Sequence, residues 1–116
     1  FSIMENVAMI EYEDFSKLDM RVAEIQTVEN IEGADKLYKL EVSIGEELRT
    51  ICAGIKEYYS HDELLGKKII VLTNLKPRKL RGIESQGMLL AAGNSDHTKI
   101  SLITPDQEIE VGSKVS

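Results

Sequence analysis

The sequence predicts a small all-β barrel with one short helix inserted after the third strand. Three observations support this class: short segments rich in β-branched residues recur along the chain, one of them alternates apolar and polar residues without exception, and turn residues separate them. The 116 residues, 42% of them hydrophobic, suit a single domain that buries roughly two thirds of its surface. Two domains of half this length would each be too small without metals or disulfides.

The first half of the chain predicts one helix and three strands. Residues 13–18 predict a short helix that begins with acidic side chains, and residues 20–28 predict the first strand. Residues 29–35 are expected to form a turn. The alternating segment 38–44 predicts a second strand with one buried face, and residues 45–53 predict a turn followed by a third strand, which completes a hairpin.

The second half predicts the inserted helix and further strands. The S-x-x-E spacing of residues 60–63 is that of a capping box and predicts a short helix. The β-branched run 68–73 predicts a strand buried on nearly both faces. Residues 88–92 are expected to return to the core, 98–104 to form a strand, and 108–115 to add a short one. This order favours a barrel of the oligonucleotide/oligosaccharide-binding (OB) type, and an SH3-like barrel would give a similar pattern.

The most informative feature is a cationic segment within an acidic chain. The formal net charge is −6, yet residues 67–81 carry +6 and contain no carboxylate, which leaves −12 on the rest. Local charge governs docking to a polyanion. Pro77 restricts the backbone and Gly82 follows, so we expect a shaped loop that contacts phosphates rather than a solvated lysine-rich tail. The cations are Lys67, Lys68, Lys76, Arg78, Lys79 and Arg81.

Guanidinium and ammonium groups bind phosphate, the first as a planar fork and the second as a mobile point charge. We therefore expect Arg78 and Arg81 to clamp phosphates. Lys76 and Lys79 are expected to strengthen the field around them.

Three further side chains are candidates for contacts with the nucleotides themselves. Asn74 and Ser85 have groups that bind base edges or ribose hydroxyls. The alternatives are that Asn74 caps a turn and that Ser85 bonds its own backbone. Met88 offers an apolar surface to a base, and the alternative is a place in the core. Only six aromatic residues are present and none is Trp, so we expect recognition by shape and phosphate positions.

Several motifs in series resemble one known family. They are Asp19-x-Arg21-Val22, Ala34-Asp35-Lys36-Leu37-Tyr38, Arg49-Thr50-Ile51, Ala53-Gly54-Ile55, Asn74-Leu75-Lys76-Pro77-Arg78-Lys79-Leu80-Arg81-Gly82, Ser85-x-Gly87-Met88 and Leu90-Ala91-Ala92. Together they resemble the tRNA-binding domain found at the C-terminus of methionyl-tRNA synthetases, in free-standing dimeric tRNA-binding proteins and in synthetase-associated cofactors.

The resemblance implies an OB-fold that binds tRNA without aminoacylating it, as a subunit, domain or partner of the methionyl-tRNA synthetase catalytic part. It adds Lys36 to the RNA-binding candidates and implies a homodimer in the cytoplasm. The sequence departs from the family pattern at Glu32-Gly33, where a His-Pro or similar pair is usual, and at Ala53, where many members have Ser. Both departures imply weaker RNA contacts near those positions.

The resemblance also leaves a second function open. A small bacterial secretion-related chaperone has the same fold and similar motifs, and it holds unfolded peptides in an apolar groove between dimer subunits. Neutral substitutions in the cationic segment would weaken RNA binding and leave peptide binding intact. The apolar residues Val7–Ile10, with Ile109, Val111 and Val115, suggest a dimer interface, or they cover the barrel ends within one chain.

The sequence predicts neither an enzyme nor a cofactor or metal site. His61 and His97 have no partner at metal-ligand spacing, and no phosphate-binding loop or nucleophile motif occurs. Cys52 is expected to be a small core residue. No apolar run approaches the roughly 20 residues of a membrane span. We divide the chain into an N-terminal extension, 1–11, whose first two residues are expected to be a cloning remnant before a native Met4, and an RNA-binding domain, 12–116.

Overall fold

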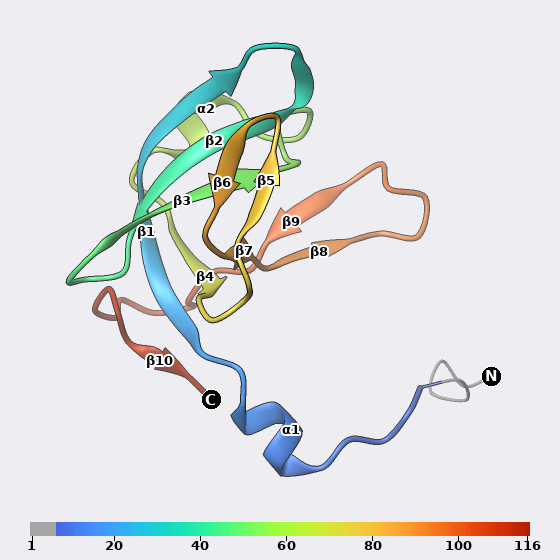
Figure 1. The fold of residues 1–116 in the computed structure, drawn as a ribbon, viewed down its shortest axis with the longest axis vertical. Helices are drawn as coiled ribbons and strands as arrows, with labels where there is room; N and C mark the ends of the chain where they lie inside the picture. Colours follow the sequence, from blue (N-terminus) through green and yellow to red (C-terminus); the bar gives the residue numbers. More distant parts are fainter. Residues whose placement is uncertain (1–6) are drawn as a thin grey trace.

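The main sheet contains six antiparallel strands. In the computed structural model, which describes residues 7–116, the strands follow the order β3-β2-β1-β4-β7, and β10 pairs with the start of β1 (Figure 1). The prediction of a mostly β fold is therefore confirmed. The strands are β1 (Met20–Ile31), β2 (Ala34–Ser43), β3 (Leu48–Ala53), β4 (Lys68–Leu72), β7 (Met88–Leu89) and β10 (Lys114–Val115).

Strands β1 and β2 form a long curved hairpin in the middle of the sheet. The expected turn at 29–35 is wrong, because β1 continues to Ile31, which pairs with Ala34. The side chains of Ile31 and Ala34 are both buried. Their packing into the core favours continued strand pairing at positions where the local sequence suggested a loop. Only Glu32 and Gly33 lie between the strands. Register shifts after Ile25 and near Ile31 bend β1 around the core.

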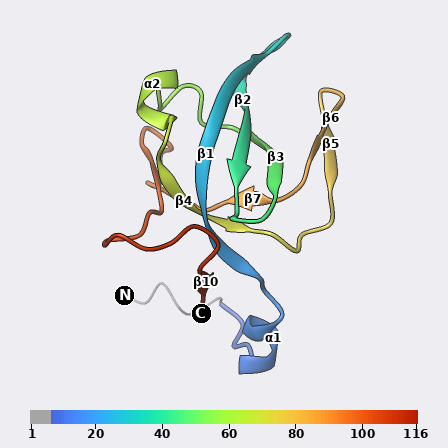
Figure 2. The ribbon, with the colours of Figure 1, turned by 90° about the vertical axis from the view of Figure 1, so that its left-hand side faces the viewer.

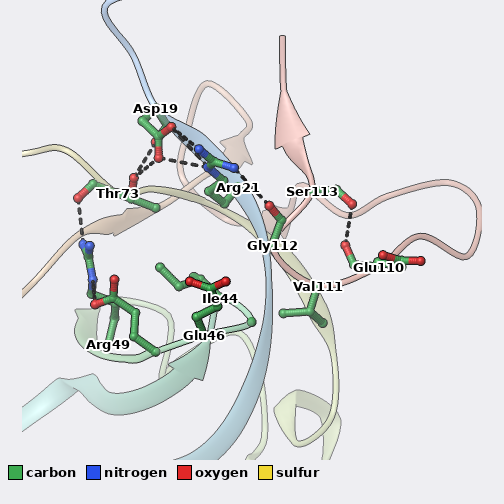
Figure 3. A pocket seen from close by; sticks show the side chains of 12 residues that line it. Asp19, Arg21, Ile44, Glu46, Arg49, Thr73, Glu110, Val111, Gly112 and Ser113 are labelled. Atoms are coloured by element: carbon green, nitrogen blue, oxygen red, sulfur yellow. Dashed lines mark hydrogen bonds and ion pairs between the residues drawn. The ribbon is translucent and has the colours of Figure 1, made fainter.

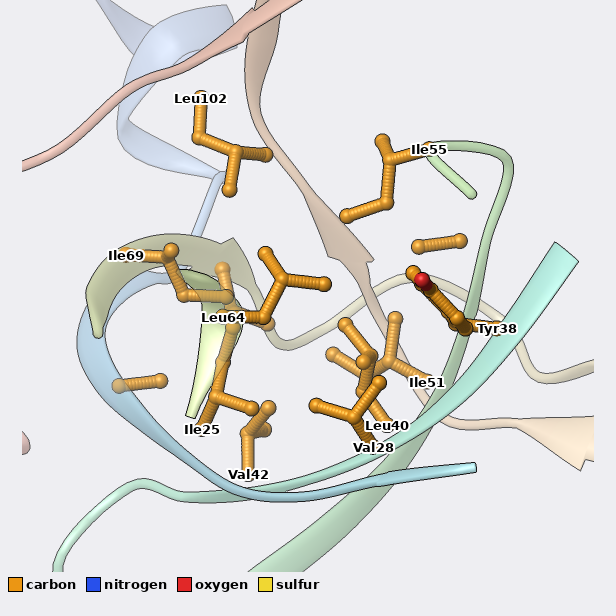
Figure 4. Close-up of a cluster of buried hydrophobic side chains, with 13 residues drawn as sticks. Ile25, Val28, Tyr38, Leu40, Val42, Ile51, Ile55, Leu64, Ile69 and Leu102 are labelled. Atoms are coloured by element: carbon orange, nitrogen blue, oxygen red, sulfur yellow. The ribbon is translucent and has the colours of Figure 1, made fainter. Parts of the chain in front are cut away.

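The core lies on the concave side of this sheet (Figure 4). The alternation in β2 buries Leu40 and Val42 completely, as predicted. The Tyr38 ring is buried as well, and its hydroxyl donates to the Tyr59 carbonyl at 2.9 Å. In β4 three successive residues from Ile69 are buried, which confirms a strand covered on both faces.

Two short helices flank the sheet. Helix α2 (His61–Leu64) begins with the predicted capping box: the Glu63 amide donates to Ser60 Oγ at 3.3 Å, and the Ser60 amide donates to Glu63 Oε1 at 2.7 Å. Its Leu64 is completely buried and completes the core. Helix α1 (Tyr12–Ser16) lies at the far end of the molecule, beyond the start of β1 (Figures 1 and 2). In the described part of the chain, no helix is long and apolar enough to cross a membrane.

Two small hairpins project from the main sheet (Figures 1 and 2). They are β5 (Arg78–Leu80) with β6 (Ile83–Ser85), and β8 (Ala91–Gly93) with β9 (Ile100–Leu102). The expected return of residues 88–92 to the core is correct for Leu89 but wrong for Met88, Ala91 and Ala92, which are exposed. Ala91 and Ala92 are exposed because β8 pairs only with β9 and has no sheet to cover it, whereas Met88 lies on β7, an edge strand of the main sheet. The predicted strands 98–104 and 108–115 are likewise shortened, to β9 and β10.

Separate hydrogen bonds, rather than a continuous β-ladder, join edge strand β3 to the end of β6 and the segment after it. The Thr50 amide donates to Gln86 Oε1 at 2.9 Å, and the Gln86 amide donates back to the Thr50 carbonyl at 2.8 Å. The Cys52 amide donates to Ser85 Oγ at 3.0 Å. These bonds satisfy edge groups of β3 that would otherwise remain unpaired, and they hold the β5–β6 hairpin against the outer face of β3.

Candidate nucleic-acid interface

The cationic segment folds as a hairpin, not as a loop. We define the cationic hairpin as residues 74–85, which comprise a short entry segment, β5 and β6. The two residues at its tip, Arg81 and Gly82, have φ of +53° and +80°. Positive φ at both central positions is the backbone requirement of a type I′ hairpin turn. Such a turn places Arg81 at the exposed end of the hairpin, in a conformation that is unfavourable for a residue with a side chain.

The cations of this hairpin are exposed and carry no ion pair. Within residues 7–116, no carboxylate approaches the charged groups of Lys76, Arg78, Lys79 or Arg81 to ion-pair distance. Lys68 differs, because its Nζ bonds Glu108 and donates to the Ile109 carbonyl at 2.6 Å. Of the six cations, the four in the hairpin are therefore available to a ligand, whereas Lys68 fastens the C-terminal segment to β4.

Several predicted residues gather around one small cavity of about 180 Å³ between the hairpin and β3. We call this cavity the apolar slot, because four of its eight lining side chains are apolar or thiol groups. The predicted Lys76, Arg78, Ser85 and Met88 all contribute to its walls. The lining residues are Cys52, Leu75, Lys76, Arg78, Leu80, Ser85, Gly87 and Met88.

A second hollow of about 270 Å³ brings Arg81 to the turn between β1 and β2. Lys36 lines it together with the tip arginine, although the two residues are far apart in the sequence. Lys36 is exposed. Lys36 thus lies beside the tip of the hairpin, in a hollow that Asp35 also lines, whereas Lys79 lies on β5 outside both hollows.

The polar side chains of Asn74 and Ser85 serve the fold. Asn74 Oδ1 accepts the Asp19 amide at 2.9 Å, and Asn74 Nδ2 donates to the Lys17 carbonyl at 2.6 Å. Ser85 is buried; its hydroxyl donates to the Gly87 carbonyl at 3.2 Å and accepts the Cys52 amide. The structure therefore shows Asn74 as a cap on distant backbone and Ser85 bonded to nearby backbone.

Cys52 is not the core residue expected from its sequence. The alternation of β3 buries its neighbours Ile51 and Ala53 on the core side. Cys52 consequently faces the hairpin, is half-buried and lines the apolar slot. Partial burial raises the pKa of its thiol, and the Lys39 ammonium opposes that effect.

A larger cavity of about 520 Å³ lies near the start of β1 and the C-terminal segment (Figure 3). Here each arginine is paired: Arg21 Nη2 donates to Asp19 Oδ1 at 2.9 Å, and Arg49 Nε donates to Glu47 Oε2 at 3.0 Å. We call it the paired-charge pocket. The bonds from Arg21, followed by the bond from Thr73, hold the pKa of Asp19 below its usual value, and partial burial opposes them.

Arg49 is a functionally placed residue whose role sequence reasoning missed. Its Nη1 donates to the Thr73 carbonyl at 2.7 Å (Figure 3). The same Nη1 donates to the Gln86 carbonyl at 3.0 Å. These carbonyls lie at the two ends of the cationic hairpin, so one guanidinium fixes both. The sequence placed Arg49 in the predicted third strand, and its two carbonyl partners are 24 and 37 residues away. In the part of the chain that is described, no group of three metal-ligating side chains comes together.

Comparisons with known proteins agree with this geometry. Residues 20–114 match the family model described as "Putative tRNA binding domain". The methionine–tRNA ligase of Caldanaerobacter subterraneus subsp. tengcongensis is 57% identical over 112 residues, which are 97% of this chain and 17% of that ligase. The chain thus spans less than a fifth of the curated relatives it matches.

Two solved structures share the fold over nearly all of this chain. A MetRS related protein from Pyrococcus horikoshii superposes with a TM-score of 0.89 at 41% identity, and the match covers 95% of this chain and 100% of that one. The CsaA chaperone protein from Picrophilus torridus superposes with a TM-score of 0.84 at 37% identity, with coverages of 93% and 100%. The sheet, inserted helix and hairpin described above therefore form a recurrent arrangement.

Proposed function

This chain belongs to the family of tRNA-binding domains, and from that premise we propose that it binds tRNA mainly through the cationic hairpin, without catalysing a reaction on it. Residues 12–116 form the binding domain in this proposal. It acts in the cytoplasm as a domain, subunit or partner of methionyl-tRNA synthetase and increases that enzyme's hold on tRNA. The relatives named as methionine–tRNA ligases support this assignment.

One observation carries the proposal: four exposed cations occupy a rigid hairpin, and no ion pair within residues 7–116 occupies their charged groups. Arg78, Lys79 and Arg81 lie within four residues of the sequence. The one carboxylate of the hairpin, Glu84, is the ladder partner of Lys79, so the hairpin keeps an excess of positive charge that an anionic ligand would neutralise. Phosphates of a folded RNA match that charge. Lys36 extends the same surface toward the β1–β2 turn.

Salt dependence tests this proposal directly. If about four cations engage phosphates, a log–log plot of affinity for total tRNA against salt should have a slope of about −3 to −4. The double variant Arg78→Gln/Arg81→Asn should flatten the slope by about one to two units. Lys99→Gln/Lys114→Gln is the matched control, because it removes the same charge outside the hairpin. Equal slopes for wild type and hairpin variant in filter binding would refute the assignment.

We expect little discrimination among tRNA species. Phosphate contacts position a protein but carry almost no base information, and the Asn74 and Ser85 side chains already bond the protein itself. Unrelated tRNAs should therefore compete within a small factor of one another, and duplex DNA should compete poorly. If one tRNA bound tighter than the others by orders of magnitude, the protein would have to read base identity, which would contradict this prediction.

We also propose that the chain forms a homodimer through apolar residues near its two ends. Val7, Met9 and Ile10 are 55%, 92% and 65% exposed, and Ile109 is 44% exposed. Contiguous exposed apolar side chains are typical of interfaces, and twofold pairing is the commonest arrangement of identical chains. Light scattering at micromolar concentration should give twice the chain mass of 13.0 kDa. Ile109→Asp/Val111→Asp should give folded monomers; a wild-type monomer would refute the proposal.

A second candidate function is the binding of unfolded polypeptides. The likeness to a protein named as a chaperone supports it, together with the same exposed apolar residues. Competition between total tRNA and a reduced, unfolded polypeptide distinguishes the two functions. Peptide binding should survive the Arg78→Gln/Arg81→Asn substitutions, whereas tRNA binding should not.

A further inference from the structure

We propose that the apolar slot beside the cationic hairpin receives one unpaired nucleobase of the bound RNA, while Lys76 and Arg78 contact the phosphates next to it. The inference rests on the proposed tRNA-binding function and adds a specific requirement to it. The bound region of the RNA must present at least one nucleotide that is not base-paired.

The apolar lining is the first argument. Leu75 and Met88 are 41% and 48% exposed, and Leu80 is half-buried beside them. These side chains are left accessible although the core of the domain is close by. The cavity of about 180 Å³ holds roughly six water molecules at the volume of liquid water. That space suits one flat ring system and excludes a base pair.

The charges around the slot select a nucleotide as its occupant. Lys76 and Arg78 are the charged residues of the lining, and no carboxylate is among the others. A nucleotide combines a flat, weakly polar base with an anionic phosphate, and the slot combines an apolar floor with two cations on its rim. An apolar side chain of a peptide would fill the floor but leave both cations without a partner.

The side chains of the slot also suit contact with the face of a base. The Met88 thioether is polarisable and flexible, so it adapts to rings of different shape. The planar guanidinium of Arg78 is a group on which bases stack. The Ser85 hydroxyl is occupied by Gly87 and Cys52. The slot therefore holds the face of a base without reading its edge, and it should accept all four bases.

Cys52 provides a direct measure of occupancy. It is the only cysteine of the chain, and it lines the slot, so an uncharged alkylating reagent reports on a single position. A base in the slot should shield the thiol. We expect a saturating RNA hairpin with an open loop to slow alkylation at mildly alkaline pH at least about fivefold. A blunt RNA duplex with the same number of phosphates should leave the rate nearly unchanged.

A matched pair of substitutions separates base contact from phosphate contact. Met88→Gln removes the apolar wall, and Leu65→Gln changes an apolar residue that is 43% exposed outside the slot. We expect Met88→Gln to weaken binding of the open-loop RNA about five- to tenfold, which is a loss of roughly 1 kcal/mol. Its salt slope should equal that of the wild type, because the slope counts phosphates. Leu65→Gln should bind as the wild type does.

The outcomes distinguish this inference from the function on which it rests. If total tRNA binds but the duplex protects Cys52 as well as the open loop does, the inference is wrong and the function stands. The same conclusion follows if Met88→Gln and Leu75→Gln, each checked for unchanged thermal unfolding, bind open-loop RNA normally. If tRNA does not bind the wild type at all, the proposed function fails first. Protection by an unfolded polypeptide and not by RNA would assign the slot to peptides.

Discussion

The paired-charge pocket and the cationic hairpin use the same side chains in opposite ways. In the pocket, Arg21 and Arg49 each bond a carboxylate and at least one backbone carbonyl. In the hairpin, the cations have no carboxylate partner within the described residues, and the tip residue Arg81 adopts positive φ. Arginines in the pocket therefore contribute to folding, whereas the hairpin, whose one carboxylate is Glu84 opposite Lys79, keeps an excess of positive charge that an anionic ligand would neutralise.

The two regions are also connected. Thr73 and Gln86, which bond Arg49 of the pocket, lie directly next to the ends of the cationic hairpin. Asn74 at its entry bonds the backbone around Asp19. The paired-charge pocket thus holds both ends of the cationic hairpin in place. Substitutions in the pocket should lower the stability of the fold, and substitutions in the hairpin should lower the affinity for tRNA.

The largest effect on stability is expected for Arg49→Met. This change leaves the carbonyls of Thr73 and Gln86 without their donor in a part-buried site. Unpaired groups of this kind cost about 1–3 kcal/mol, and we expect about 2–3 kcal/mol less free energy of unfolding in urea. tRNA affinity should fall as a consequence. Arg49→Lys keeps the charge and should recover part of the loss, while an unchanged urea midpoint in Arg49→Met would contradict this role.

A smaller and pH-dependent effect is expected for Asp19→Asn. Since the folded-state pKa of Asp19 lies below the usual aspartate value of 3.8, the ionised carboxylate stabilises the fold above that value. This contribution is lost as the pH falls through the folded-state pKa. We expect the variant to lose about 1 kcal/mol at pH 7 and the two proteins to converge as the pH falls through the folded-state pKa. A stability difference that did not shrink on acidification would mean that the charge is not the cause.

The smallest effect on stability is expected for Arg81→Asn, and its sign is reversed. Asn-Gly is the preferred pair in a type I′ turn, and Asn tolerates positive φ better than Arg does. Free energy of unfolding should therefore stay the same or rise by up to about 0.5 kcal/mol, while the salt slope of tRNA binding loses about one unit. Arg81→Lys should keep the slope. A clear loss of stability in Arg81→Asn would show that the arginine serves the fold.

The elements that were predicted correctly are those whose sequence signals involve residues close together in the chain. Alternation identified β2 and its buried face, the capping box of Ser60 and Glu63 identified α2, and the β-branched run identified β4. Each signal acts within a few residues, so a linear pattern contains it. The cationic hairpin lacks such a pattern, because its two strands are only three residues long and mostly polar. It was consequently predicted as a loop.

The sequence by itself determined that the chain is a mostly β domain, that its positive charge is concentrated in residues 67–81, and that this segment was the place to look for a phosphate ligand. Only the tertiary structure decided which of those cations are unpaired. It also decided that Asn74 and Ser85 bond the protein, that Cys52 faces the slot, and that Lys36 approaches Arg81. The physical reason is that ion pairs and hydrogen bonds join residues up to 91 positions apart, and their pairing follows from the packed fold.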